Sequence, residues 1–149
     1  MIGTDEFWGT VLRLVNEGKI TKIKPTGISM VPFIMGDRDL VEIKSAEPLL
    51  KRGDIVLFRR DNGHYVLHRI FKVRGDEYYL LGDSQKDVEG PIKREQIVAQ
   101  SRFYYKNGKR KDNDAFFMKI KYTLWFWLRP IRWPLIKINS FKRKLMGKE

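Results

Sequence analysis

The sequence predicts a mainly β protein: an antiparallel folded sheet or partly closed barrel, preceded by a short helix and followed by a basic, aromatic helical tail. Two observations support this fold class. Between Lys19 and Tyr105 the chain alternates short β-prone runs with Gly-Asp and Asn-Gly turns. Outside that region, apolar residues recur at helical spacing instead. We therefore expect an N-terminal amphipathic helix in 1–18, a β domain in 19–106 and a tail in 107–149.

The N-terminal helix is expected over residues 4–17. Its apolar residues recur at the spacing of one helical face: Phe7, Trp8, Val11, Leu12 and Val15. Gly18 follows the last of them, as a glycine does at a helix C-terminus. Asp5 and Arg13 interrupt the segment, so it does not fit a signal peptide, which needs an apolar stretch of about 7–15 residues. We expect this helix to pack on the sheet or to assist anchoring.

Five strands are expected in the β domain. They are the β-prone runs 40–43, 55–59, 65–73, 77–81 and 97–105. The tripeptides Asp-Asn-Gly at 61–63 and Arg-Gly-Asp at 74–76 are typical of hairpin turns between neighbouring antiparallel strands. Short strands joined in this way favour a folded sheet or a partly closed barrel.

Charge separates the β domain from the tail. The chain has 149 residues and no cysteine, which excludes disulfides, a thiolate zinc site and a cysteine nucleophile. Its net charge is +12, but residues 1–101 hold 16 basic and 15 acidic side chains, whereas residues 102–149 hold 14 basic and 3 acidic ones. The β domain is therefore nearly neutral, and the tail carries the charge that would attract an acidic partner.

The tail combines this charge with apolar and aromatic side chains. Residues 115–138 carry phenylalanines, tryptophans and aliphatic residues near helical spacing, interrupted by lysines and arginines. The run is too often interrupted to provide the roughly 18 apolar residues of a spanning helix, and Pro130 and Pro134 break it further. We expect peripheral association with an anionic membrane surface. The alternatives are packing on its own domain, a protein partner, or, least favoured, nucleic acid.

Three residues in the β domain are of the types that support nucleophilic catalysis. Ser29 lies between Gly27 and Pro32, where the backbone is constrained. A base such as histidine, with an ordinary pKa of about 6.5, must take the serine proton. His68 lies within an apolar strand, and Asp83 ends the next strand, from which an acid could reach the far ring nitrogen. On spacing alone, the favoured interpretation is a turn serine, a core or edge histidine and a turn aspartate, and a catalytic triad is the less favoured one.

Four sequence boxes add a family resemblance. They are Ser29-Met30-Val31-Pro32 with Gly36-Asp37, then Arg52-Gly53-Asp54-Ile55-Val56, then His68-Arg69, and last Gly82-Asp83 followed by Glu89. In this order, the boxes resemble those of the signal peptidase I family, which shares its fold with self-cleaving repressors. The resemblance covers residues 26–100. Most bacterial members carry lysine where His68 stands, whereas the endoplasmic-reticulum, archaeal and sporulation members carry histidine.

The resemblance implies a serine endopeptidase with Ser29 as nucleophile and His68 as general base. The orienting acid would be Asp83 or Glu89, with Asp87 a lesser candidate. A second set of residues, Met30 and Pro32, would bind substrate. The implied reaction cleaves a peptide or precursor protein after small residues, in an extended segment added to a sheet edge, through an acyl-enzyme on Ser29 and without a cofactor or metal.

Two other functions remain open. A self-cleaving repressor would need a DNA-binding helix-turn-helix, for which residues 1–25 are too short, and a lysine in place of His68. A non-catalytic peptide-binding or membrane-anchored module of the same fold would keep the same residues. The residues before the β domain do not show the apolar run of a spanning segment, so we expect a departure from the membrane anchor of the resembled family. We expect the tail to replace that anchor and the substrate to be a dedicated one.

Overall fold

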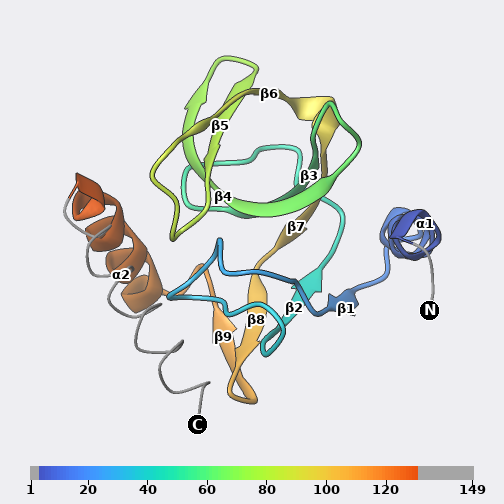
Figure 1. The fold of residues 1–149 in the computed structure, drawn as a ribbon, viewed down its shortest axis with the longest axis horizontal. Helices are drawn as coiled ribbons and strands as arrows, with labels where there is room; N and C mark the ends of the chain where they lie inside the picture. The colour runs from blue at the N-terminus through green and yellow to red at the C-terminus, as the bar shows by residue number, and fades with distance from the viewer. Residues whose placement is uncertain (1–3, 131–149) are drawn as a thin grey trace, which may run out of the picture.

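Two antiparallel sheets form the body of the protein, and the computed structural model describes residues 4–130 (Figure 1). The first sheet has the order β1-β2-β8-β9 and the second β6-β5-β4-β3-β7. The elements are α1 (Thr4–Asn16), β1 (Thr21–Ile23), β2 (Leu40–Ile43), β3 (Ile55–Arg59), β4 (Tyr65–Arg74), β5 (Glu77–Leu81), β6 (Glu89–Lys93), a 3-10 turn (Arg94–Gln96), β7 (Ile97–Ser101), β8 (Phe103–Lys106), β9 (Lys109–Asp112) and α2 (Phe116–Trp127). The expected mainly β, antiparallel class is confirmed, with two sheets rather than a closed barrel.

The five-stranded sheet contains both predicted hairpins. β3 pairs with β4, and β4 pairs with β5, each in antiparallel register. Alternation along β4 places Leu67 in one apolar core and Ile70 in the other. The sheet therefore separates two cores, and neighbouring residues of β4 face different ones.

Three strands, β1, β6 and β9, were not predicted from the sequence pattern. β1 is only three residues long, β6 includes Gly90 and Pro91, and β9 has the sequence Lys-Arg-Lys-Asp. None of them shows the apolar alternation by which strands are recognised. The expected run 97–105 is also two strands, because the chain crosses from one sheet to the other between β7 and β8. Because β8 pairs with β9, the expected domain boundary at residue 106 falls inside a hairpin.

Helix α1 agrees with the sequence pattern. Val11 and Val15 are buried in the core, and the hydroxyl of Ser45 donates a 2.7 Å hydrogen bond to the carbonyl oxygen of Val15. The first half of the helix extends past this attachment. There, the ring of Trp8 lies 5.0 Å from that of Tyr65 on β4. The second half of α1 is thus fixed to the core, and its first half reaches the larger sheet.

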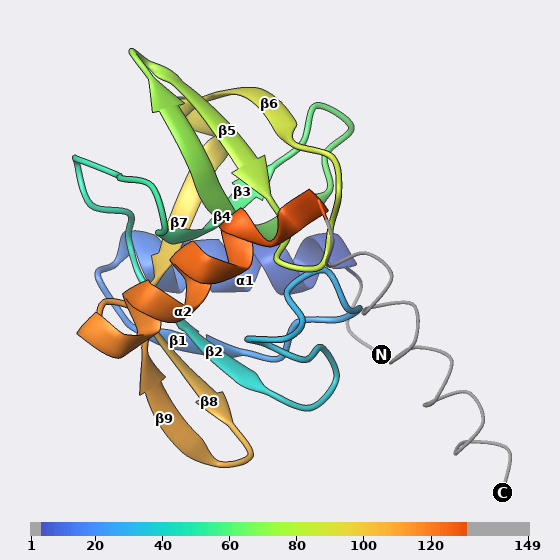
Figure 2. The same ribbon diagram turned by 90° about the vertical axis from the view of Figure 1, so that its left-hand side faces the viewer.

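Helix α2 packs on the β domain through one face. Tyr122 and Phe126 are buried, and the indole N–H of Trp125 donates a hydrogen bond to the backbone carbonyl oxygen of Asp83. Figure 2 shows α2 in front of the sheets with α1 behind them, so the two helices cover opposite sides. Among residues 4–130, no helix is long and apolar enough to cross a membrane. The expected tail beyond residue 130 lies outside the described residues.

Candidate active site

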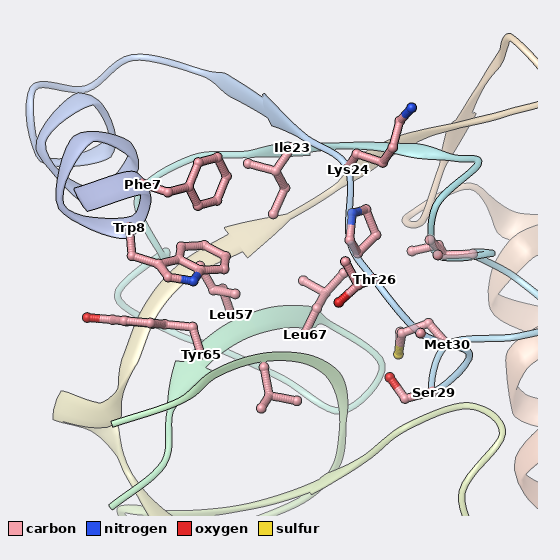
Figure 3. A pocket seen from close by; sticks show the side chains of 15 residues that line it. Phe7, Trp8, Ile23, Lys24, Thr26, Ser29, Met30, Leu57, Tyr65 and Leu67 are labelled. Atoms are coloured by element: carbon pink, nitrogen blue, oxygen red, sulfur yellow. The ribbon is translucent and has the colours of Figure 1, made fainter. Parts of the chain in front are cut away.

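Ser29 lies in the loop between β1 and β2, on the wall of a pocket of about 520 Å³. This volume is typical of small-molecule and peptide subsites. Figure 3 shows the Ser29 hydroxyl beside Met30, at the opposite end of the pocket from Phe7 and Trp8 of α1. The pocket therefore joins the candidate nucleophile to the overhanging half of α1.

Glycines shape the loop that carries Ser29. Gly27 has a φ of +82°, a conformation that side-chain-bearing residues rarely adopt. The Gly36 N–H donates a 3.0 Å hydrogen bond to the carbonyl oxygen of Gly27, so closely that a Cβ at residue 36 would collide with residue 27. The predicted constrained backbone around Ser29 is present, and Met30, 4% exposed, lies in both the core and the pocket wall.

A second attachment connects the Ser29 loop to the segment after β5. The backbone N–H of Ser84 donates a 2.9 Å hydrogen bond to the carbonyl oxygen of Ser29. The Ser84 hydroxyl donates a 2.6 Å hydrogen bond to the carbonyl oxygen of Ile28. A Cβ at Gly82 would lie 2.7 Å from the same Ser29 oxygen. The predicted substrate residue Pro32 is exposed and does not line this pocket; its carbonyl oxygen accepts from Lys106.

His68 lies close to this attachment in the strand register. It pairs with Val56 on β3, and the adjacent Arg69 pairs with Leu81 on β5. Continuing the antiparallel register by one residue places Gly82 opposite His68. Gly82 is therefore the shared neighbour of the Ser29 carbonyl and of His68. Sequence reasoning selected two residues that the fold brings to the same region.

The two side chains nevertheless form no hydrogen bond in this state. His68 is 1% exposed, and both of its ring nitrogens are buried without a hydrogen-bond partner. Its ring lies 5.6 Å from that of Phe58, which belongs to the core on the Ile70 side of the sheet. Met30, next to Ser29, belongs to the other core.

Burial controls the protonation of His68. Loss of hydration disfavours the imidazolium and lowers its pKa to about 4, while the Glu89 carboxylate opposes and the Arg60 guanidinium reinforces this shift. His68 is consequently neutral near pH 7, as a general base must be. The same low pKa makes it a weak base before substrate is bound.

The predicted acid Asp83 is held by arginine instead of histidine. Arg69 donates from Nε and Nη2 to the two Asp83 oxygens at 2.8 and 2.9 Å, and both side chains are completely buried. Arg69 also donates from Nη1 to the carbonyl oxygen of Gly53 and to Oδ1 of Asn113. This network joins β4, the segment after β5, the turn before β3 and the segment before α2. Sequence reasoning missed Asn113, for which the pattern offers no signal.

The other two acids are also directed elsewhere. Glu89 accepts from Arg60 through both of its oxygens, with Nη2 to Oε1 at 2.8 Å, and Asp87 is exposed. Neither of them contacts a His68 ring nitrogen. The Glu89 carboxylate is still close enough to oppose, in part, the lowering of the His68 pKa by burial.

Within the described part of the chain, no cluster of three or more histidine or acidic side chains is arranged to hold a metal ion. The pocket wall carries the Ser29 hydroxyl and several apolar side chains, and the buried His68 follows the pocket residue Leu67 on β4. The pocket residues of α1, Phe7 and Trp8, were expected only to pack on the sheet or to assist anchoring.

Comparison with known proteins does not assign the chain to a family: no family model matches it, and no curated protein matches it.

Proposed function

We propose that the protein is a serine endopeptidase of the signal peptidase type that cleaves an extended peptide through an acyl-enzyme on Ser29. One observation supports this above the others: Ser29 lies on the wall of a pocket, and its carbonyl lies beside Gly82, which the continued strand register places opposite His68. The four sequence boxes and the two-sheet architecture are consistent with the proposal.

The reaction proceeds in two halves. Ser29 Oγ attacks the peptide carbonyl carbon while its proton passes to His68, and His68 then protonates the departing amine. The resulting ester is attacked by water, whose proton passes to His68 and then to Ser29 Oγ as the carboxylic acid product leaves. This sequence requires Ser29 and His68 to come within hydrogen-bond distance when a peptide is bound. Catalytic hydrogen bonds are often long in the free enzyme and shorten in the substrate complex.

The substrate is proposed to add to the free edge of β1. β1 is the first strand of its sheet, and Ile23 and the following residues line the pocket beside Ser29. An added strand would gain main-chain hydrogen bonds there, and alternate side chains would point into the pocket. Because Trp8, Leu57 and Leu67 line the pocket, the side chain that enters it is apolar. The volume of about 520 Å³ admits a larger side chain than the small residues that the family resemblance implies.

Digestion of a mixed peptide library by the full chain tests this proposal. Mass spectrometry would identify new termini, and we expect Ser29→Ala and His68→Leu to remove all of them because each deletes a member of one catalytic unit. His64→Gln is the matched control, since His64 is exposed in the β3–β4 loop and should be dispensable. Equal cleavage by wild type and Ser29→Ala would contradict the proposal.

A non-catalytic peptide-binding module is the second candidate. The observation that favours it is that both His68 nitrogens lack a partner while the nearby acids bind arginines. Such a module would bind apolar peptides in the same pocket and release them uncut. Peptide binding that survives Ser29→Ala, with no cleavage by wild type at any pH between about 4 and 9, would select this function over the first.

A further inference from the structure

Helix α2 presents an apolar surface that nothing in the described structure covers. Six large apolar side chains along it are between 41% and 75% exposed: Phe116, Phe117, Ile120, Leu124, Trp127 and Leu128. Four of them, Phe116, Ile120, Leu124 and Trp127, line a shallow groove of about 340 Å³ together with Lys119 and Thr123. A contiguous patch of this kind is unusual on a soluble domain and marks an interaction surface.

The distribution of residues around α2 is that of a helix lying at an interface. At 3.6 residues per turn, the six apolar residues fall within an arc of about 120°. Tyr122 and Phe126 lie on the opposite arc and pack on the β domain. Lys119 and Lys121 lie on either side of the exposed arc, where their ammonium groups can extend outward from an apolar layer.

The charged side chains of α2 itself have one sign. Helix α2 contains two lysines and no acidic residue. Arg129 follows the helix, and its guanidinium donates to the backbone carbonyl oxygen of Lys86, which adds a further cation beside Trp127. Anionic headgroups complement such a border of cations around an apolar strip.

We propose that this face of α2 binds the surface of an anionic membrane, with the helix axis in the plane of the interface and the six apolar side chains inserted below the headgroups. A second copy of the chain fits less well, because a symmetric helix pair would bring the flanking lysines of both copies together. Nucleic acid also fits less well, because the centre of the strip is Ile120 and Leu124, which do not stack on bases.

The test measures partitioning of the full chain onto vesicles. Lipid vesicles of phosphatidylcholine with and without phosphatidylglycerol are sedimented, and the bound protein fraction is measured. Leu124→Glu with Trp127→Glu should lower the partition coefficient on the anionic vesicles at least about tenfold, since two large apolar side chains no longer insert. Wild type should bind the uncharged vesicles more weakly.

The matched control is Ile20→Glu with Leu49→Glu, which changes the same charge on two exposed aliphatic residues outside α2. It should bind nearly as well as wild type. Thermal unfolding measurements check that both double variants fold. If the Leu124→Glu, Trp127→Glu variant does not fold, the variant Leu124→Ser with Trp127→Ser is used in its place. Since residues beyond 130 remain present in every variant, the measurement isolates the α2 face.

Three results would overturn the proposal. The first is unchanged vesicle binding by the α2 variant. The second is self-association of wild type without lipid that the same variant abolishes, which would assign the face to a second copy. The third is salt-sensitive DNA binding that the variant removes. None of these measurements depends on peptidase activity, so the membrane proposal and the proposed function fail separately.

Discussion

Replacement of His68 by leucine should remove a large part of the pH dependence of folding. In the folded protein, burial lowers the pKa of His68 to about 4, whereas an exposed histidine in the unfolded chain has its ordinary value of 6.5. As the pH falls below about 6.5, His68 becomes protonated in the unfolded chain but stays neutral in the folded protein. The free energy of unfolding therefore decreases. The loss is complete once the pH is below the folded pKa.

The size of the effect follows from the shift. Each pKa unit is equivalent to about 1.4 kcal/mol, so the wild type should lose about 3 kcal/mol of unfolding free energy through His68 between about pH 7 and pH 4. His68→Leu lacks this contribution and preserves an apolar side chain against Phe58. The carboxylates that titrate in the same range are common to both proteins. The difference between their unfolding free energies should therefore change by about 3 kcal/mol across the interval.

Urea denaturation at a series of pH values provides the measurement, with His64→Gln as the control for the other histidine. Because the chain has two histidines, NMR titration of their ring signals gives an independent reading from the same samples. His68 should keep the signals of a neutral ring down to about pH 4. Parallel pH profiles for wild type and His68→Leu would refute the reasoning, since they would mean that His68 titrates alike in both states.

The remaining predictions concern the residues around the site. Arg69→Met should cost about 3–5 kcal/mol of unfolding free energy by urea denaturation, because it leaves a buried carboxylate unpaired. Arg60→Met removes a half-exposed ion pair and should cost less than about 1 kcal/mol, while raising the pKa of His68 by NMR because a nearby cation is lost. A larger loss in Arg60→Met than in Arg69→Met would contradict both statements. Gly82→Ala should lower kcat/KM by roughly a hundredfold, since its Cβ would displace the carbonyl of the nucleophile. Unchanged turnover in that variant would show that this contact does not position the serine.

The turns made most of the fold predictable. Asn62-Gly63 and Gly75-Asp76 mark the two hairpins, and the strands they join are long enough to show alternation. Short or polar strands are formed by pairing with neighbours, and this cannot be deduced from local pattern. β9 is the clearest case, since three of its four residues are basic and its position depends on β8.

The positions of Ser29 and His68 could be predicted from the sequence, but the partner of the acidic residue could not. Ser29 and His68 stand where their motifs suggested, on a constrained loop and a buried strand. The partner of the acid could not be predicted in this way, because Arg69 and His68 are adjacent on β4 and successive side chains of a strand point to opposite faces. A carboxylate bound to Arg69 therefore lies on the other face of the strand from the His68 ring. Whether an acid pairs with His68 or with Arg69 depends on the fold, and here Asp83 pairs with Arg69.

The hydrogen bond from Trp125 to the Asp83 carbonyl gives α2 a fixed relation to the nucleophile. Asp83 precedes Ser84, whose N–H holds the carbonyl of Ser29. If α2 rests on a bilayer and Ser29 is the nucleophile as proposed, the scissile bond lies at a fixed height above the lipid. Only substrates whose cleavage point lies at that height from their own membrane attachment would be cut, so length, and not residue type alone, would select them.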